Sequence, residues 1–182
     1  MPRLTLKSKV CLVGESAVGK TSLIRKFVLN SFEDKYISTI GTKVCKKPLT
    51  FENAGVSVYI DMMIWDIMGQ SSFRTLLQDS YFHGASGIIA VCDATRHDTL
   101  TALDGWVDSV RQVAGEIPLV ILANKSDLTS HLQVSESDLE LKSKKHKTLS
   151  WHFTSAKTGE NVAEAFQAMG AAIVQRQSRG VR

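Results

Sequence analysis

The chain has 182 residues, a formal net charge of +4 and 43% hydrophobic residues. This length and average composition exclude disordered and fibrous proteins and indicate one globular domain over 1–182, with a core at 7–174 and a basic tail at 175–182. The positive excess is too small to indicate nucleic-acid binding. The longest apolar runs are strand-sized rather than membrane spans, and Lys7 and Lys9 interrupt any signal-peptide core. We therefore expect a cytoplasmic protein without a transmembrane segment.

Short apolar runs alternate with segments of helical periodicity along the chain. Two extended runs flank the turn residues 52–55, which predicts an antiparallel hairpin. Ser135 and Asp138 have the spacing of a capping box that opens a helix. In chain order the predicted elements are a strand at 10–13, a helix around 23–28, strands at 42–51, 56–65 and 88–92, a helix around 100–110, a strand at 119–123, a helix from 136 to 147, a strand at 149–153 and a helix around 162–173.

This alternation indicates an α/β fold in three layers. Strands with continuous apolar runs are typical of parallel sheets that are covered on both faces. We therefore predict a six-stranded, mostly parallel sheet with one antiparallel edge strand and helices on both faces. Trp106, Met62 and Met63 are expected in the core, and the lysines within 142–147 are expected on a solvated helix end.

Four unusual segments begin where predicted strands end, at 14–21, 65–70, 124–127 and 154–157. In parallel α/β sheets ligands bind beyond the carboxyl ends of the strands, so these segments should meet at one edge. Their convergence indicates a binding site more strongly than any one of them does alone.

The segment Gly14-Glu-Ser-Ala-Val-Gly-Lys-Thr21 matches the phosphate-binding pattern G-x-x-x-x-G-K-[ST]. Its glycines allow backbone N–H groups to surround phosphates, and the following helix adds its positive N-terminus. Lys20 would reach the β and γ phosphates, and the Thr21 hydroxyl would bind Mg²⁺. The position of the segment disfavours a glycine-rich turn without a ligand. The expected nucleotide contacts are Glu15, Ser16, Ala17, Val18, Gly19, Lys20, Thr21 and Ser22.

The segment 124–127, Asn-Lys-Ser-Asp, addresses the base of the nucleotide. The carboxylate of Asp127 can accept hydrogen bonds from N1–H and the 2-amino group of guanine, whereas adenine offers neither donor. An unpaired buried polar group of this kind rejects the wrong ligand by roughly 10⁴-fold. The segment 155–157 would add a backbone contact to guanine O6. The expected guanine contacts are Asn124, Lys125, Asp127, Ser155, Ala156 and Lys157.

Asp66, Gly69 and Gln70 follow the third predicted strand. Gly69 can rotate its N–H toward a γ-phosphate, and Gln70 can orient an attacking water. Thr39 offers a second hydroxyl to Mg²⁺, an ion that prefers an octahedron of oxygen ligands. We expect these ligands to be Thr21, Thr39, two phosphates and two waters, one of which Asp66 holds.

These motifs resemble those of the small GTPases of the Ras superfamily, most of all its Rab branch, from about residue 7 to residue 173. The Rab-like runs are Ser38-Thr-Ile-Gly41, Trp65-Asp66, Phe73-Arg-Thr75 and Tyr81-Phe-His-Gly-Ala85. The resemblance implies the fold of P-loop NTPases and binding of GTP or GDP with Mg²⁺. It also implies two switch loops at 33–42 and 67–77, which the γ-phosphate orders. Phe32 would lie against the guanine ring, and Tyr36 would cover the phosphates.

The chain departs from the family pattern after Asp66. Relatives have Asp-Thr-Ala-Gly-Gln-Glu where this chain has Asp66-Ile-Met-Gly-Gln-Ser71. Met68 replaces a very small residue beside the switch glycine, so we expect its bulk to slow the switch or displace the attacking water. Ser71 removes a carboxylate that helps exchange factors eject nucleotide. Lysines within 43–47 stand where Rab proteins present acidic or apolar effector contacts.

Membrane-cycling relatives end in prenylated cysteines, but no cysteine of the printed sequence follows Cys92. The chain either stops short of such a cysteine or is natively without a lipid, so we expect at most peripheral membrane contact. The resemblance implies effectors, exchange factors and GTPase-activating proteins as partners through the two switch loops. We expect the chain to be a monomer.

The sequence as a whole predicts a guanine-nucleotide switch that hydrolyses GTP slowly, with membrane trafficking as the setting that the Rab resemblance implies. Lys20, Thr39, Gly69 and Gln70 are the expected catalytic residues. Turnover without a partner should be on the order of 10⁻⁴ to 10⁻³ s⁻¹. Two alternatives stay open: a module that binds GTP without hydrolysing it, because of the departures after Asp66, and an ATP-using P-loop enzyme.

Overall fold

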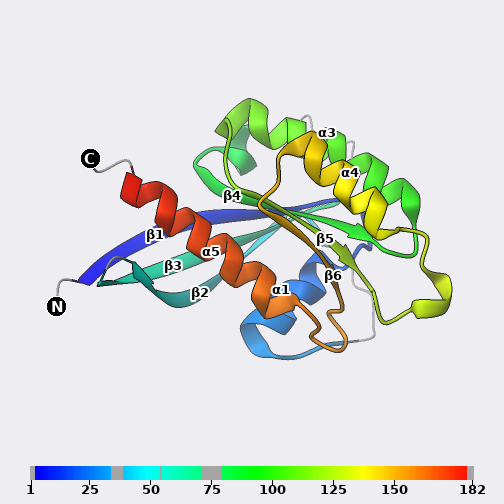
Figure 1. Ribbon diagram of the computed structural model, residues 1–182, viewed down its shortest axis with the longest axis horizontal. Coiled ribbons are helices and arrows are strands. Elements are labelled where there is room, and N and C mark those ends of the chain that lie inside the picture. The colour runs from blue at the N-terminus through cyan, green and yellow to red at the C-terminus, as the bar shows by residue number, and fades with distance from the viewer. Residues whose placement is uncertain (1–2, 34–38, 54, 71–78, 180–182) are drawn as a thin grey trace.

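The computed structural model describes residues 3–33, 39–53, 55–70 and 79–179. Within these residues six strands form one sheet in the order β2-β3-β1-β4-β5-β6 (Figure 1). β2 pairs with β3 in antiparallel orientation, and every other neighbouring pair is parallel. The predicted mostly parallel sheet with one antiparallel edge strand is therefore confirmed. The strands are β1 (Arg3–Val13), β2 (Thr42–Asn53), β3 (Val56–Ile67), β4 (Ala85–Asp93), β5 (Leu119–Asn124) and β6 (Ser150–Thr154).

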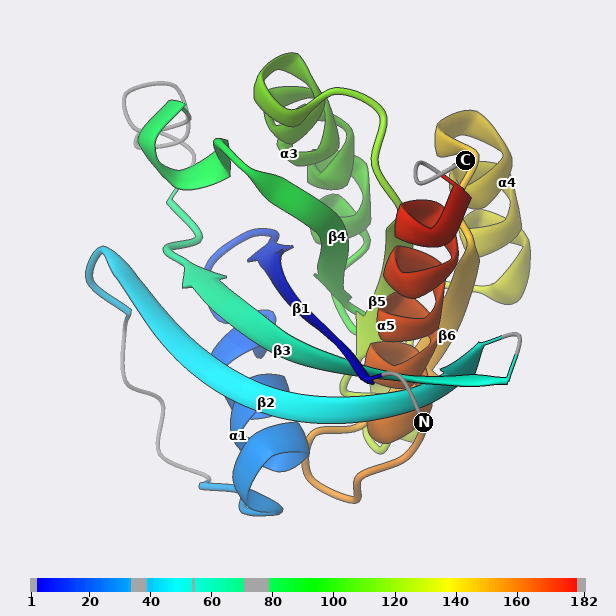
Figure 2. The same cartoon turned by 90° about the vertical axis from the view of Figure 1, so that its left-hand side faces the viewer.

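Helices cover both faces of this sheet, as predicted (Figures 1 and 2). The helices are α1 (Lys20–Leu29), α3 (His97–Ala114), α4 (Glu136–His146), α5 (Val162–Arg179) and a short 3₁₀ helix, η1 (Thr129–His131). α1 and α5 pack on one face, and α3 and α4 pack on the other.

Each pair of helices shares a separate apolar core with the sheet. Leu23 of α1 and Phe166 of α5 belong to the first core, and the rings of Phe27 and Phe166 stack with their centroids 4.3 Å apart. Leu103 and Trp106 of α3 belong to the second core. Because burial of one large apolar side chain contributes about 1.5–3 kcal/mol, the two cores hold the sheet firmly between its helical layers.

The capping box predicted at the start of α4 is present. The Ser135 hydroxyl accepts a hydrogen bond from the backbone N–H of Asp138, and the Asp138 carboxylate accepts one from the backbone N–H of Ser135. Acidic residues in the first turn and basic residues in the last complement the helix dipole. Local sequence signals therefore define where this helix begins.

All six strands differ from their predicted bounds, and the differences at β1 and β6 have clear physical reasons. β1 begins at Arg3 rather than at residue 10. Its first half pairs only with β3 in the described structure, and β4 joins it from Lys9 onward. Because this first half of β1 has only one neighbouring strand, its sequence lacks the continuous apolar run that marks a fully buried strand. β6 begins at Ser150 rather than at Leu149, whose side chain is 51% exposed.

The two methionines of β3 have different surroundings. Met62 is fully buried, as predicted, but Met63 is only half-buried, so its predicted place in the core is wrong. Neighbouring residues of a strand point to opposite faces. Met62 belongs to the core under α1 and α5, whereas Met63 pairs with Lys9 and Lys46 on the other face.

The lysines at the end of α4 are not all solvated, contrary to the prediction. Lys142 and Lys145 donate to the Asp104 carboxylate of α3 at 2.9 and 2.7 Å, and the buried His146 lies 2.6 Å from the same carboxylate. Burial raises the pKa of Asp104, but the hydrogen bonds from His146 and the two lysines outweigh it and lower the pKa. This cluster joins α3 to α4, and it was missed because the two helices are far apart in the sequence.

The last helix extends into the segment expected as a basic tail. α5 continues to Arg179, and Arg176 donates to the carbonyl of Glu116 at 2.5 Å. Across the described part of the chain, no helix combines the length and apolar character that a membrane crossing requires.

Candidate functional site

A cavity of about 320 Å³ opens at the carboxyl ends of β1, β3 and β5, the edge where the sequence predicts a ligand site. Most of the predicted contact residues line it. These are Ser16, Ala17, Gly19, Lys20, Thr21, Ser22, Phe32, Thr39, Gly69, Gln70, Asn124, Lys125, Asp127, Ala156 and Lys157. Segments from widely separated parts of the chain therefore meet at one place.

Other predicted residues lie behind this lining or beyond the described ranges. Glu15, Val18, Asp66 and Ser155 do not line the cavity; Val18 and Ser155 are fully buried behind it. Tyr36, Ser71 and the run 73–75 lie outside the described residues.

Gly19, which precedes α1, joins the segment 14–21, called here the phosphate loop, to the segment 124–127, called here the base loop. Gly19 has a φ of +100°, and a Cβ at this position would lie 2.2 Å from Nδ2 of Asn124. Only glycine adopts this backbone readily and allows so close an approach. Asn124 Nδ2 in turn donates to the carbonyl of Val18 at 2.9 Å. The two loops therefore form one unit.

Lys20 is the buried cation of the site, with 6% of its surface exposed. Its ammonium donates to the carbonyls of Gly14 and Glu15 at 2.7 and 2.8 Å. Burial lowers the pKa of Lys20 to about 8, although the charges of Asp66 and Glu15 partly oppose this shift. A lysine ammonium has three donors, so one remains to face a ligand oxygen in the cavity.

Three oxygen-bearing side chains converge below the phosphate loop. Thr21 Oγ1 lies 3.0 Å from Thr39 Oγ1 and donates to Asp66 Oδ2. Asp66 is 2% exposed, and its Oδ1 has no hydrogen-bond partner in the described structure. Burial raises the pKa of Asp66, although the Thr21 hydrogen bond and the charges of Lys20 and Lys43 act to lower it. Hard oxygens around an unsatisfied carboxylate fit Mg²⁺, which takes oxygen ligands and keeps several waters.

No group of three or more His, Cys, Asp or Glu side chains in the described residues could hold a metal ion. The Thr21, Thr39 and Asp66 set contains a single carboxylate, so it needs ligand oxygens to complete an octahedron. Such a site is suited to an ion that arrives with a phosphate ligand.

The base loop is held in place by buried hydrogen bonds. Ser155 Oγ donates to Asp127 Oδ1 at 2.6 Å. Asn124 Oδ1 accepts from the N–H of Ala156 at 3.2 Å and from the Thr154 hydroxyl at 3.3 Å. Asp127 thus presents a positioned carboxylate at the cavity, which is the acceptor that a guanine edge requires.

The segment after β3 closes against the phosphate loop. A Cβ at Gly69 would lie 2.5 Å from the Glu15 carbonyl carbon and 2.6 Å from Lys20 Nζ, so only glycine fits there. The N–H of Met68 donates to the carbonyl of Gly41 at 3.1 Å. This bond links the two segments that the sequence predicts as switches. Gln70 is exposed at the rim of the cavity.

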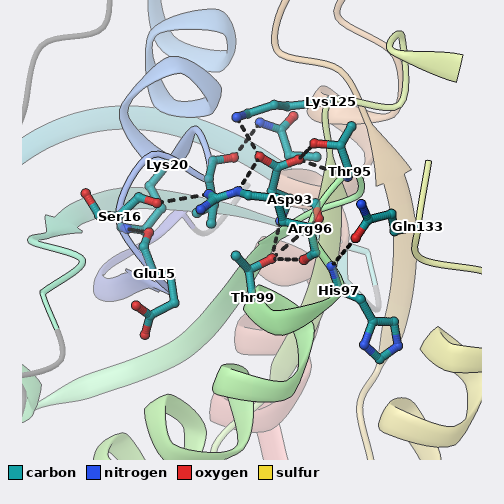
Figure 3. A network of polar contacts seen from close by, with 12 residues as sticks. Glu15, Ser16, Lys20, Asp93, Thr95, Arg96, His97, Thr99, Lys125 and Gln133 are labelled. Carbon is teal, nitrogen blue, oxygen red and sulfur yellow. Dashed lines mark hydrogen bonds and ion pairs between the residues drawn. The ribbon is translucent and has the colours of Figure 1, made fainter. Parts of the chain in front are cut away.

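Asp93, at the end of β4, joins the phosphate and base loops, and none of the motifs in the sequence contains it (Figure 3). Its Oδ2 accepts from Lys125 Nζ at 2.6 Å and from Arg96 Nε at 3.1 Å. Arg96 also donates to the carbonyl of Ser16 at 3.1 Å, while Asp93 Oδ1 accepts twice from Thr95. Burial raises the pKa of Asp93, but the hydrogen bonds from Lys125 and Thr95 outweigh it and lower the pKa. The position of Asp93 at the end of a predicted strand is the sequence feature that could have indicated its role.

Trp106 has a second role besides the predicted place in the core. Its indole Nε1 donates to Glu15 Oε1 at 2.9 Å. This hydrogen bond anchors the phosphate loop on α3. The helical spacing of Trp106 predicts only a place in the core and does not indicate this bond.

Two comparisons relate this chain to known proteins. The model of the Ras family matches residues 9–175. The chain is 35% identical over 170 residues to the GTP-binding protein ypt4 of Schizosaccharomyces pombe, and this alignment covers 92% of the chain and 72% of ypt4. Both comparisons agree with the resemblance that the motifs carry.

Proposed function

Since this chain belongs to the Ras family of small GTPases, we propose that its cavity binds GTP or GDP through the phosphate and base loops described above. The chain is a Rab-like GTP-binding switch that hydrolyses GTP to GDP and phosphate. This membership disfavours both a module without hydrolysis and an ATP-using enzyme.

One observation carries the choice of guanine. Asp127 stands at the cavity with its Oδ1 fixed by Ser155, and Asn124 ties the same loop to Val18 of the phosphate loop. A base held by Asp127 therefore lies at a fixed distance from phosphates held by Lys20. An adenine base would offer Asp127 neither an N1–H nor a 2-amino donor, so the carboxylate would keep only the hydrogen bond from Ser155 and would lose those that a guanine base supplies.

The phosphates would be held by the backbone N–H groups of the loop, by Lys20 and by a cation. Thr21, Thr39 and Asp66 have the oxygen chemistry to hold Mg²⁺, with Asp66 acting through a water. A Mg²⁺ ion supplies neutralisation of the charge that develops on the β and γ phosphates. Phe32 and Tyr36 would cover the nucleotide at the base and the phosphates.

Hydrolysis would proceed by in-line attack of water on the γ-phosphate. Gln70 would orient the water, the N–H of Gly69 would meet the γ-phosphate, and Lys20 would stabilise the charge of the transition state. Without an activating partner the rate should be on the order of 10⁻⁴ to 10⁻³ s⁻¹.

A competition experiment tests the nucleotide assignment. The full chain is loaded with fluorescent GDP, and unlabelled GTP, GDP or ATP is titrated against it. We expect displacement by GTP and GDP, and displacement by ATP only at roughly 10⁴-fold higher concentration. Asp127→Ala should abolish this preference. Asp98→Ala is the control, because it removes an acidic residue in the first turn of α3, and it should keep the preference. Equal displacement by ATP and GTP would contradict the proposal.

A single-turnover experiment tests the hydrolytic roles. Release of phosphate from preloaded GTP is followed over hours for the wild type and for Gln70→Leu. We expect slow release from the wild type and at least a tenfold lower rate in the variant, because the water then loses its orienting group. Equal rates would remove Gln70 from the mechanism.

Partners would dock on the segments 33–42 and 67–77, whose arrangement depends on the γ-phosphate in switches of this family. Effectors, exchange factors and GTPase-activating proteins are the expected classes. The Rab-like sequence favours membrane trafficking as the setting, with peripheral contact to a membrane.

A further inference from the structure

A second lysine stands beside the proposed metal position. Lys43 of β2 is directly opposite Asp66 of β3 in the antiparallel register, and it lines the same cavity as Thr21 and Thr39. Residues directly opposite each other in such a pair have Cβ atoms about 4.5–5.5 Å apart on one face of the sheet. The Lys43 side chain therefore starts next to Asp66, the one carboxylate in the set of Thr21, Thr39 and Asp66.

The face of the sheet fixes the direction of this lysine. Cys45, two residues further along β2, and Ile64, two residues before Asp66 in β3, both pack in the core under α1. Because side chains alternate between faces, Lys43 and Asp66 also project to the side of α1, whose first turn carries Thr21. Lys46 projects to the opposite face, where it forms an ion pair with Asp61 at 2.7 Å.

The charge of Lys43 reaches the Asp66 carboxylate. Burial raises the pKa of Asp66, and Lys43 is among the groups that oppose this rise. A positive charge that attracts the carboxylate must repel a divalent cation placed beside the same carboxylate.

We propose that Lys43 weakens the binding of Mg²⁺ to the nucleotide complex of this protein by like-charge repulsion. The inference rests on the proposed function, because it concerns the Mg²⁺ that accompanies GDP. Lys43 is exposed, so solvent screens its charge, and we expect that charge to change the affinity for Mg²⁺ by roughly three- to tenfold.

The experiment measures how Mg²⁺ slows nucleotide release. The full chain loaded with fluorescent GDP is mixed with excess unlabelled GDP over a range of free Mg²⁺ concentrations, and the release rate is recorded. Lys43→Gln should lower the Mg²⁺ concentration at the midpoint of this curve by roughly three- to tenfold. Lys43→Arg keeps the charge and should keep the midpoint of the wild type.

Lys46→Gln is the matched control, since it removes a lysine of the same strand from the opposite face. Its midpoint should stay within about twofold of the wild type. In about 1 M salt, where the screening length is about 3 Å, the difference between Lys43→Gln and the wild type should shrink.

Three outcomes would overturn the inference: an unchanged midpoint for Lys43→Gln, a shift in the other direction, or an equal shift for Lys46→Gln. In each of them the wild type still binds GDP and responds to Mg²⁺, so the proposed function stands. If Mg²⁺ leaves the release rate of the wild type unchanged, the proposed metal site fails and the inference fails with it.

Discussion

Lys20 shows how burial changes the pKa of a single residue. Its ammonium is held by two backbone carbonyls, and burial lowers its pKa to about 8. Only the protonated form attracts phosphate, and a bound phosphate raises the pKa again. The affinity for GDP should therefore be greatest below pH 8 and should decrease as the pH rises above it.

Between pH 7 and pH 9 the affinity for GDP, measured by fluorescence titration, should decrease about tenfold, since one pH unit above the pKa leaves about a tenth of Lys20 charged. Lys20→Arg stays protonated throughout and should lack this decrease. An equal decrease in both proteins would assign the pH dependence to another group.

Met68 is the residue whose size departs most from the family pattern. It lines the cavity, as do its neighbours Ile67 and Gly69, and its backbone N–H donates to the carbonyl of Gly41. Met68→Ala should therefore keep this bond, make room for the water and raise the single-turnover rate of GTP hydrolysis roughly threefold or more, equivalent to somewhat under 1 kcal/mol of barrier. Met63→Ala, on the outer face of β3, should leave the rate unchanged. A rate for Met68→Ala at or below that of the wild type would show that its bulk does not hinder hydrolysis.

At the scale of elements, the segment between β4 and α3 joins the phosphate loop to the base loop. Asp93 holds Lys125 of the base loop and Arg96, and Arg96 holds the carbonyl of Ser16 in the phosphate loop. Movement of either loop must then break bonds to the other through one carboxylate that is 2% exposed. This network should slow the release of nucleotide.

Arg96→Ala removes one link of the network without touching the cavity lining. The release rate of fluorescent GDP should increase roughly two- to tenfold, the equivalent of one hydrogen bond. Arg176→Ala, which also removes an arginine bonded to a backbone carbonyl but at the far end of α5, should leave the rate unchanged. If both variants release GDP as slowly as the wild type, the link to Ser16 contributes nothing to retention.

At the scale of the whole molecule, the cavity is built from segments that only the folded chain brings together. The lining comes from the ends of β1, β3 and β5 and from the start of α1. A ligand that binds only this arrangement stabilises the folded state by mass action, by about 2.7 kcal/mol at a hundred times its dissociation constant.

GDP with Mg²⁺ should therefore raise the melting temperature. For a domain of this size the increase should be roughly 5–10 °C at that concentration, as measured by differential scanning calorimetry. The same concentration of ATP should leave the melting temperature unchanged, and Asp127→Ala should lose the response to GDP. A melting temperature that ATP raises as much as GDP would contradict the selectivity of the site.

The sequence by itself determined the fold class, the order of the elements and most of the cavity lining. Each motif of the cavity is a short continuous segment that follows a predicted strand, and parallel strands bring their carboxyl ends to one edge of the sheet. The strand at 10–13 and the capping box at Ser135 were equally local signals. The first half of β1 was missed because it pairs only with β3 in the described structure, and Met63 was misplaced because it lies on the face of β3 opposite to Met62.

Only the tertiary structure decided which distant side chains meet. Lys43 faces Asp66 because of the register of β2 on β3, and Trp106 reaches Glu15 because α3 packs beside the end of β1. Asp93 meets Lys125 because β4 and β5 are neighbours. Periodicity records which face a residue occupies, but pairing across strands and helices depends on register and packing, which are properties of the folded chain.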